Sequence, residues 1–276
     1  MSAIDLTDEA YWRVGVFVFA ALVLLTLEAK RPFRDGESAR AHRLGNLLIG
    51  ALGVITLRLA FPLLAVGFAA VIEVRGWGLM QWLDAPYLLA LLVGVVALDL
   101  AVYWQHRLMH IVPWLWRLHR PHHTATEFEL SLALRFHPLE QVLSLLVKML
   151  VIAALGIPAL AVLVFEIILS TSALYTHGNI ALPERWDRRV RRLLVTPSMH
   201  RIHHSVRADE HQRNFGFFLS LWDRAFASYC ANSREPPQRM PLGLPEHRAE
   251  ADQRPLGALI NPFTAAPAPG RTQSED

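Results

Sequence analysis

Residues 86–110 read PYLLALLVGVVALDLAVYWQHRLMH, a long apolar run that leads directly into two histidines. The first 20 of these residues carry a single charge, Asp99, and a helix of about that length crosses the hydrocarbon core of a bilayer. The last five residues, His106-Arg-Leu-Met-His110, place two imidazoles four residues apart, on one face of a helix. The stretch therefore predicts a membrane-spanning helix whose end carries a pair of histidines.

Two further histidine boxes follow later in the chain. They read His119-Arg-Pro-His-His123 and His200-Arg-Ile-His-His204, and three such boxes together argue against chance clustering of surface histidines. Each box directs its imidazoles to one helix face, and imidazole binds iron, zinc, copper and nickel. Eight imidazoles exceed the ordinary coordination number of one ion. The pattern therefore predicts two metals, with each histidine doublet serving both.

The remaining apolar tracts predict an all-α integral membrane bundle. The chain is 53% hydrophobic and 18% charged, and its first apolar tract covers residues 11–27. Residues 44–72 form either one long tilted span or two half-helices broken at Pro62. Residues 139–176 are interrupted by Gly156-Ile-Pro158, which predicts a turn and hence a helical hairpin.

Charge around the first span predicts its orientation. Acidic residues precede it and basic residues follow it, and basic residues favour the cytoplasmic side. We therefore expect an N-terminus outside, histidine boxes on the cytoplasmic face and no cleaved signal peptide. The net charge of +3 does not indicate nucleic acid, since the basic residues lie beside apolar spans. The flanking residues are Asp5, Asp8 and Glu9 before the span, and Lys30, Arg31 and Arg34 after it.

Segments around the boxes carry a family resemblance. They are Arg135-Phe-His-Pro-Leu-Glu140, His177-Gly-Asn179, Asn214-Phe-Gly216 and Leu221-Trp-Asp-Arg224 with Phe226. With the boxes, they resemble the fatty acid hydroxylase and sterol desaturase superfamily of membrane di-iron enzymes. The resemblance covers residues 99–229. Phe226-Ala-Ser228 departs from the family's Phe-Gly-Thr, in a stretch that we expect to be structural.

The resemblance implies the cofactor and the chemistry. Two non-haem irons would activate dioxygen and attack a C–H bond of a lipid such as a sterol or fatty acyl chain, giving hydroxylation or desaturation. The electron donor would be a separate protein of ferredoxin or cytochrome type. The chain has no Gly-rich dinucleotide motif, and a single cysteine, Cys230, provides no iron–sulfur cluster.

The predicted site includes residues outside the boxes. The resemblance implies that His177 is a metal ligand, whereas His137 is either a ligand or a polar residue that begins a helix. Asp99 lies two helical turns before His106 and is a candidate catalytic residue that accepts an imidazole N–H, unless it contacts Arg58 instead. The predicted ligands are His106, His110, His119, His122, His123, His137, His177, His200, His203 and His204.

Other predictions concern packing and domain limits. Lys148 and Glu166 lie eight residues either side of the predicted turn, so we expect them to pair within the hairpin. Residues 1–98 would hold the N-terminal spans, 99–229 the catalytic domain, and 230–276 a loosely packed tail, disordered at least after residue 263. His211, His42 and His247 are expected to face solvent.

Two other functions are compatible with a histidine-rich membrane protein. A metal transporter would place its ligands near the bilayer midplane on broken helices, whereas these boxes lie among arginines beyond the span ends. A zinc hydrolase site on a membrane anchor would use about three protein ligands, fewer than this chain offers.

Overall fold

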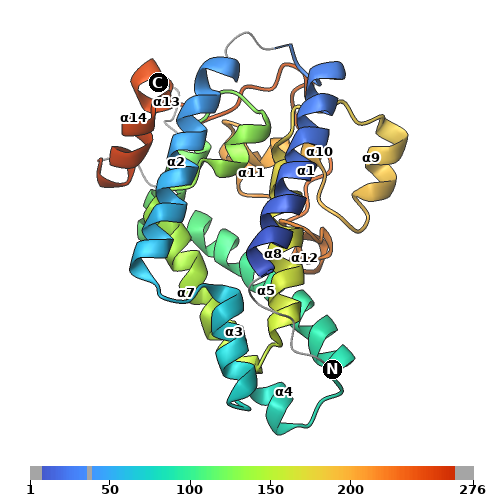
Figure 1. The fold of residues 1–276 in the computed structure, drawn as a ribbon. Helices are drawn as coiled ribbons and strands as arrows, with labels where there is room; N and C mark the ends of the chain where they lie inside the picture. The colour runs from blue at the N-terminus through green and yellow to red at the C-terminus, as the bar shows by residue number, and fades with distance from the viewer. Residues whose placement is uncertain (1–7, 36–38, 265–276) are drawn as a thin grey trace.

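The computed structural model describes residues 8–35 and 39–264, and 67% of these described residues are helical. Within this described part, five segments are long and apolar enough to cross a membrane, as judged by length and composition. The architecture is therefore the predicted all-α membrane bundle of a multi-pass protein (Figure 1). The long helices are α1 (Glu9–Lys30), α2 (Ala39–Ala60), α5 (Tyr87–Ile111), α7 (Pro138–Leu155) and α8 (Ala159–His177).

The second apolar tract is broken, as one of its two predicted forms requires. Helix α2 ends at Ala60 and α3 (Ala65–Val74) begins after Pro62, which has no backbone N–H to continue the helix. A short helix, α4 (Leu79–Trp82), then turns the chain toward α5. Gly78 has a φ of 101°, and a Cβ there would lie 2.1 Å from the backbone nitrogen of Gly156. The α3–α4 end of the bundle therefore closes tightly on the turn between α7 and α8.

The predicted helical hairpin is confirmed. Helix α7 ends at Leu155 and is followed by Gly156, which has a left-handed conformation, and α8 starts directly after Pro158. Inside the hairpin, Lys148 Nζ lies 2.5 Å from a carboxylate oxygen of Glu166, so the predicted pair is also confirmed. Arg13 of α1 lies 3.3 Å from the other oxygen of that carboxylate and attaches α1 to the hairpin.

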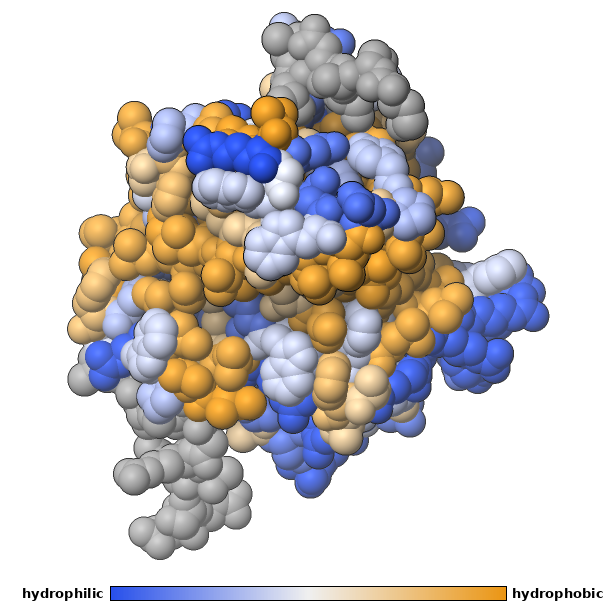
Figure 2. Space-filling model, turned by 90° about the horizontal axis from the view of Figure 1, so that it is seen from below, coloured by the Kyte–Doolittle hydropathy of each residue, from blue (hydrophilic) through white to orange (hydrophobic). Residues whose placement is uncertain are grey.

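The core lies between α3, α5, α7 and α8. Leu98, Val102, Ile152, Ala161 and Phe165 are among its buried side chains. Helix α1 packs against α8, and α2 packs against α7. The outer surface is also apolar: viewed from the α3–α4 end, Figure 2 shows hydrophobic side chains over much of this face, with hydrophilic groups toward its edges. A surface of this kind suits a bilayer rather than water.

Short helices cover the opposite end of the bundle, where α5 ends and α7 begins (Figure 1). They bring segments that are distant in sequence onto the ends of the spans. They are α6 (Pro113–His123), the 3₁₀ helix η1 (Leu130–Leu134), α9 (Glu184–Val190), α10 (Pro197–His203), α11 (Ala208–His211) and α12 (Leu221–Ala225).

The expectation of a loosely packed tail is wrong for residues 236–264. Met240, Leu242 and Leu244 are buried in this segment, which forms α13 (Glu250–Gln253), α14 (Pro255–Ile260) and η2 (Asn261–Phe263). Its polar groups accept hydrogen bonds from two buried arginines of the site end, Arg120 and Arg135. The predicted disorder beyond this point falls on residues 265–276, which lie outside the described residues.

Candidate metal centre

Four helices carry the histidines to one place. The end of α5 provides the first box, α6 the second and α10 most of the third, while His177 is the last residue of α8. Helix α10 begins with Thr196 at the N-cap and Pro197 in the first turn, although the Thr196 hydroxyl does not cap the helix. All eight box histidines and His177 are buried.

The nine imidazoles form two separate clusters. Within each cluster one nitrogen per ring can be chosen so that all lie within 4.8 Å of one another. The two doublets are divided, because His123 and His203 face the first cluster whereas His122 and His204 face the second. The first cluster holds His106, His110, His119, His123 and His203, and the second holds His122, His177, His200 and His204.

Hydrogen bonds at the back of the rings define the chemistry of the first cluster. His106 Nδ1 lies 2.7 Å from the carbonyl oxygen of Phe215, and His203 Nδ1 lies 2.8 Å from that of Arg213. A carbonyl only accepts, so each ring carries its proton on Nδ1 and has a lone pair on Nε2. Yet these two Nε2 atoms lie 3.0 Å apart, and that of His119 lies 3.1 Å from His106. Facing lone pairs need a cation between them.

The second cluster has the same arrangement. His177 Nδ1 lies 2.8 Å from the carbonyl oxygen of Ala173, so its Nε2 also carries a lone pair. That atom lies 2.9 Å from His200 Nε2 and 3.1 Å from His122 Nε2. Only one of these two neighbours can donate a proton to that lone pair, so the convergence of the three nitrogens fits a metal ion of the type that imidazole prefers.

Burial supports metal binding by keeping the rings neutral. It lowers the pKa of His119 to about 3, and it also lowers the pKa values of His200, His203 and His204. Neutral imidazoles keep the lone pair that a metal needs at neutral pH. Several buried ring nitrogens have no hydrogen-bond partner among the described residues: both of His110 and the Nδ1 atoms of His122, His200 and His204.

Glu140 is a functional residue that the sequence analysis did not single out. Its Oε1 atom lies 2.7 Å from His119 Nδ1, so the carboxylate orients this ring and raises its basicity as a donor. Glu140 belongs to the Arg135–Glu140 segment, which supports the family resemblance but assigns no role to this carboxylate. Glu140 and His119 are 21 positions apart in the sequence, so no local pattern indicates their contact.

Asp99 does not accept a hydrogen bond from an imidazole, so the predicted contact is wrong. Its Oδ2 atom accepts from the indole N–H of Trp222 at 2.8 Å and from the backbone N–H of Leu219 at 3.2 Å. The alternative contact with Arg58 is also absent from the hydrogen bonds and ion pairs of the described residues. Asp99 therefore holds the segment that follows the third box, rather than the metal site itself.

That segment in turn holds His106. Asp223 accepts the backbone N–H groups of Phe215 and Gly216 at 2.8 and 2.9 Å, and the Ser228 hydroxyl at 2.7 Å. This fixes the Phe215 carbonyl that accepts the proton of His106. The expectation that the Asn214–Ser228 stretch is structural agrees with this arrangement.

Comparison with known proteins now identifies the family. The family model for fatty acid hydroxylase matches residues 91–228, which is half of the chain and contains all three boxes and His177. The chain belongs to the fatty acid hydroxylase family.

Relatives in this fatty acid hydroxylase family are distant in sequence. Ornithine lipid hydroxylase OlsE of Rhizobium tropici is 26% identical over 92% of this chain and 76% of its own length. Alkylglycerol monooxygenase of Homo sapiens is 28% identical over 51% of this chain, and that of Caenorhabditis elegans is 26% identical over 78%. The matches cover only 30% and 42% of these two relatives. No solved structure matches the chain.

Two further histidines of the chain differ from expectation. His137 lies in neither cluster: its Nδ1 accepts the N–H of Leu139 at the start of α7, and its Nε2 donates to the Leu259 carbonyl at 3.2 Å. Both ring nitrogens are used by the backbone, so the alternative of a helix-starting histidine describes it. His247 is buried rather than solvent-facing.

The expectation that His211 faces solvent is also wrong. Its side chain is buried, and its ring lies 5.2 Å from that of His110 and 5.6 Å from that of His123, between ring centres. Burial lowers its pKa to about 4. It stands seven residues after His204, but α10 ends at His203 and a separate helix, α11, carries His211, so no helical repeat connects it to the third box.

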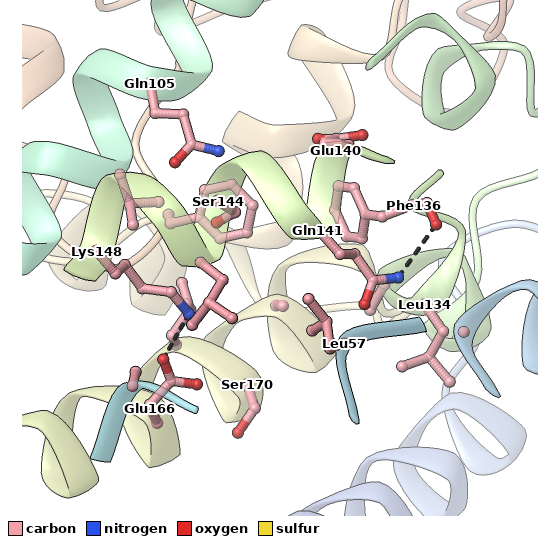
Figure 3. A pocket seen from close by; sticks show the side chains of 18 of the residues that line it. Leu57, Gln105, Leu134, Phe136, Glu140, Gln141, Ser144, Lys148, Glu166 and Ser170 are labelled. Atoms are coloured by element: carbon pink, nitrogen blue, oxygen red, sulfur yellow. Dashed lines mark hydrogen bonds and ion pairs between the residues drawn. The ribbon is translucent and has the colours of Figure 1, made fainter. Parts of the chain in front are cut away.

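A cavity of about 320 Å³ reaches the first cluster from within the bundle. His106, His119 and Glu140 line one end of it, and most of the wall is apolar, with Val102, Leu145 and other side chains from α2, α5, α7 and α8. Figure 3 shows this cavity with Glu140 on one side and the Lys148–Glu166 pair on another. An apolar molecule can therefore approach the imidazoles without leaving the membrane domain.

Proposed function

We propose that this chain is a membrane-bound, non-haem di-iron oxidoreductase that hydroxylates a C–H bond of a lipid. Dioxygen would be the co-substrate, and electrons would come from an external donor of ferredoxin or cytochrome type. The observation that carries the proposal is the pair of buried imidazole clusters, the first of which lines an apolar cavity inside the spans through His106 and His119. A transporter would instead need ligands near the middle of the membrane.

The residues of the two clusters would hold one iron each. When bound, the irons would supply the redox chemistry that activates dioxygen toward an unactivated C–H bond. The protein's part is to position the substrate and to exclude water: His106 and His119 line the cavity, and Glu140 keeps the proton of His119 on Nδ1, which leaves the lone pair of Nε2 for the metal. The apolar wall keeps water away from the reacting carbon.

The substrate is a lipid, and hydroxylation is the preferred outcome. The membrane-like surface and the apolar cavity wall support a lipid, which can reach the site from the bilayer. Relatives over 92% and 78% of the chain are named as a hydroxylase and a monooxygenase, which favours hydroxylation over desaturation. Sterol, fatty acyl and other lipid classes remain compatible with this wall.

The metal centre would face the cytoplasm. Helix α1 ends at the centre, since the carboxylate of Glu28 accepts the backbone N–H of Asn179 at 3.0 Å. Lys30 and Arg31 follow at this same end, whereas Glu9 begins the helix at the other. Basic residues beside a span favour the cytoplasmic side, so the N-terminus would lie outside.

The test is incubation of membranes that contain the protein with isotopically labelled dioxygen and a reductant, followed by lipid mass spectrometry. One labelled oxygen atom should enter a lipid product, and His204→Ala should abolish it. His42→Ala is the matched control, because His42 lies outside both clusters. A product with a new double bond and no label would reject hydroxylation. Conversion that continues without dioxygen would reject the oxidase chemistry.

A further inference from the structure

The cavity has a polar wall as well as apolar ones. Glu140, Ser144 and Lys148 succeed one another at four-residue intervals along α7, and all three line the cavity (Figure 3). This spacing places them on a single face of the helix. Gln105 of α5 also lines the cavity, and its side-chain oxygen is buried without a hydrogen-bond partner among the described residues. A plain hydrocarbon chain would offer no hydrogen-bond partner to this stripe of polar side chains, which consists of Glu140, Ser144 and Lys148.

A charged group lies at the end of the stripe. Glu166 is shared by Lys148 at 2.5 Å and by Arg13 at 3.3 Å, and Arg13 also pairs with Glu9 at 2.9 Å. The side chains of Lys148 and Glu166 are each only 11% exposed. They lie ten residues into α7 and seven residues into α8, well inside the spans. Ionisable groups there are costly, which makes a function for them the default expectation.

The group is balanced in charge but not in hydrogen bonding. Two cations, Arg13 and Lys148, face two carboxylates, those of Glu9 and Glu166. A lysine has three N–H donors and an arginine five, so more donors are present than the recorded pairs use. The spare N–H groups can therefore donate hydrogen bonds to an uncharged ligand oxygen at little electrostatic cost. A charged ligand would instead add an uncompensated charge in a medium of low dielectric constant.

Geometry relates this charged group to the metal centre. Lys148 follows Glu140 by eight residues, which is about 12 Å along a helix. Glu140 contacts His119 of the first cluster at 2.7 Å. The cavity also reaches the outside of the bundle, because Val54 of α2 lines it and is 56% exposed. Arg13 of α1 lines the same cavity, so a lipid can enter sideways between α1 and α2.

We infer that Arg13, Lys148 and Glu166 form a binding subsite for an uncharged acceptor oxygen of the substrate, the carbonyl of an ester or amide. The carbonyl accepts N–H groups of Lys148 and Arg13, and the stripe along α7 directs the rest of the molecule toward His106 and His119. The subsite thereby sets which carbon is oxidised, about 12 Å away. This inference rests on the proposed function, since it assumes that the cavity receives the substrate.

Competition for a photoreactive probe tests the subsite without turnover. The full chain with its metals, in lipid nanodiscs, is cross-linked by a long-chain methyl ester that carries a diazirine on its alkyl chain. Unlabelled methyl ester, free acid or alkane of the same length then competes. The ester should compete about tenfold better than the alkane or the acid, the value of a hydrogen bond to a charged donor. Equal competition by the alkane, or better competition by the acid, would overturn the inference.

Variants separate binding from a purely structural ion pair. Lys148→Met should remove the ester's advantage over the alkane, while Lys148→Arg, which keeps the charge and the donors, should retain it. Metal content and melting temperature of each variant report the fold. A Lys148→Met protein that melts earlier but still prefers the ester would show that the pair only attaches helices, and would overturn the subsite. Ester preference without oxygenation would reject the proposed function instead, and oxygenation without ester preference would reject only the subsite.

Discussion

The Nε2 atoms of His106 and His203 lie 3.0 Å apart, although each ring donates its only proton to a backbone carbonyl behind it. Two lone pairs at this distance repel unless a cation separates them. The protein therefore fixes the tautomers of both rings before any metal arrives, through carbonyls of the segment at residues 213–215. Binding of metal and folding of this end of the molecule should consequently be coupled.

Removing the carboxylate behind His119 should weaken the first cluster. In Glu140→Gln the side chain keeps its shape but loses the charge that holds the ring proton. We expect metal affinity to fall by about tenfold to a hundredfold, as for other carboxylates behind metal-bound histidines. Metal titration of the apo protein measures this. Glu184→Gln, at an exposed ion pair, is the control, and equal affinities in the two variants would count against the role of Glu140.

Asp99 should act by holding the segment after the third box. Asp99→Ala removes the acceptor of the Trp222 indole and the Leu219 amide, at a cost of about 3 kcal/mol for the two hydrogen bonds. Asp99→Asn keeps an acceptor oxygen and should retain most of the stability and activity. Thermal melting and lipid conversion are the measurements. Complete loss of activity in a stable Asp99→Asn protein would instead indicate a direct catalytic role.

The C-terminal segment should be required for a stable metal centre. A chain truncated after Glu235 loses the buried Met240 and Leu242, together with the carbonyls that accept from Arg135. We expect a loss of at least about 3 kcal/mol and a lower melting temperature, because the buried guanidinium of Arg120 would lose its partners at Asn261 and Thr264, and that of Arg135 would lose two of its acceptors. Truncation after Thr264 is the control. Identical melting of the two truncated chains would show that the segment contributes nothing.

Narrowing the opening of the cavity should slow the reaction without changing the metal content. Val54→Trp puts a large ring where the cavity meets the outer surface of α2. Product formation should fall about tenfold, equivalent to about 1.4 kcal/mol, with unchanged metal content. Leu59→Trp, on the exposed part of the same helix but away from the cavity lining, is the matched control. A Val54→Trp enzyme as active as the control would place the lipid's route elsewhere.

Local sequence patterns predicted what depends on helix periodicity. The five apolar segments, the turn at Gly156 and the convergence of the box histidines follow from spacing and hydropathy. So does the Lys148–Glu166 pair, because equal numbers of residues separate each from the turn. The division of the His122-His123 doublet between clusters also has a local cause. Adjacent residues on a helix point about 100° apart and cannot face one site.

Contacts between distant segments were not predictable in this way. His137 uses both ring nitrogens on backbone groups, one of them at Leu259, so its spacing beside the boxes was misleading. His211 is buried because α11 packs beside Trp116, which no local pattern indicates. The C-terminal segment is poor in large apolar residues and prolines interrupt it. Its backbone carbonyl groups accept hydrogen bonds from buried arginines, and a hydropathy pattern does not indicate such contacts.

Metal content of the purified chain tests most directly whether two ions occupy two separate histidine clusters. Elemental analysis should find two iron ions per chain, one for each cluster. His203→Ala should lose the metal of the first cluster, His200→Ala that of the second, and His42→Ala neither. A single tightly bound metal that is indifferent to both cluster variants would contradict the two-metal centre and the chemistry proposed from it.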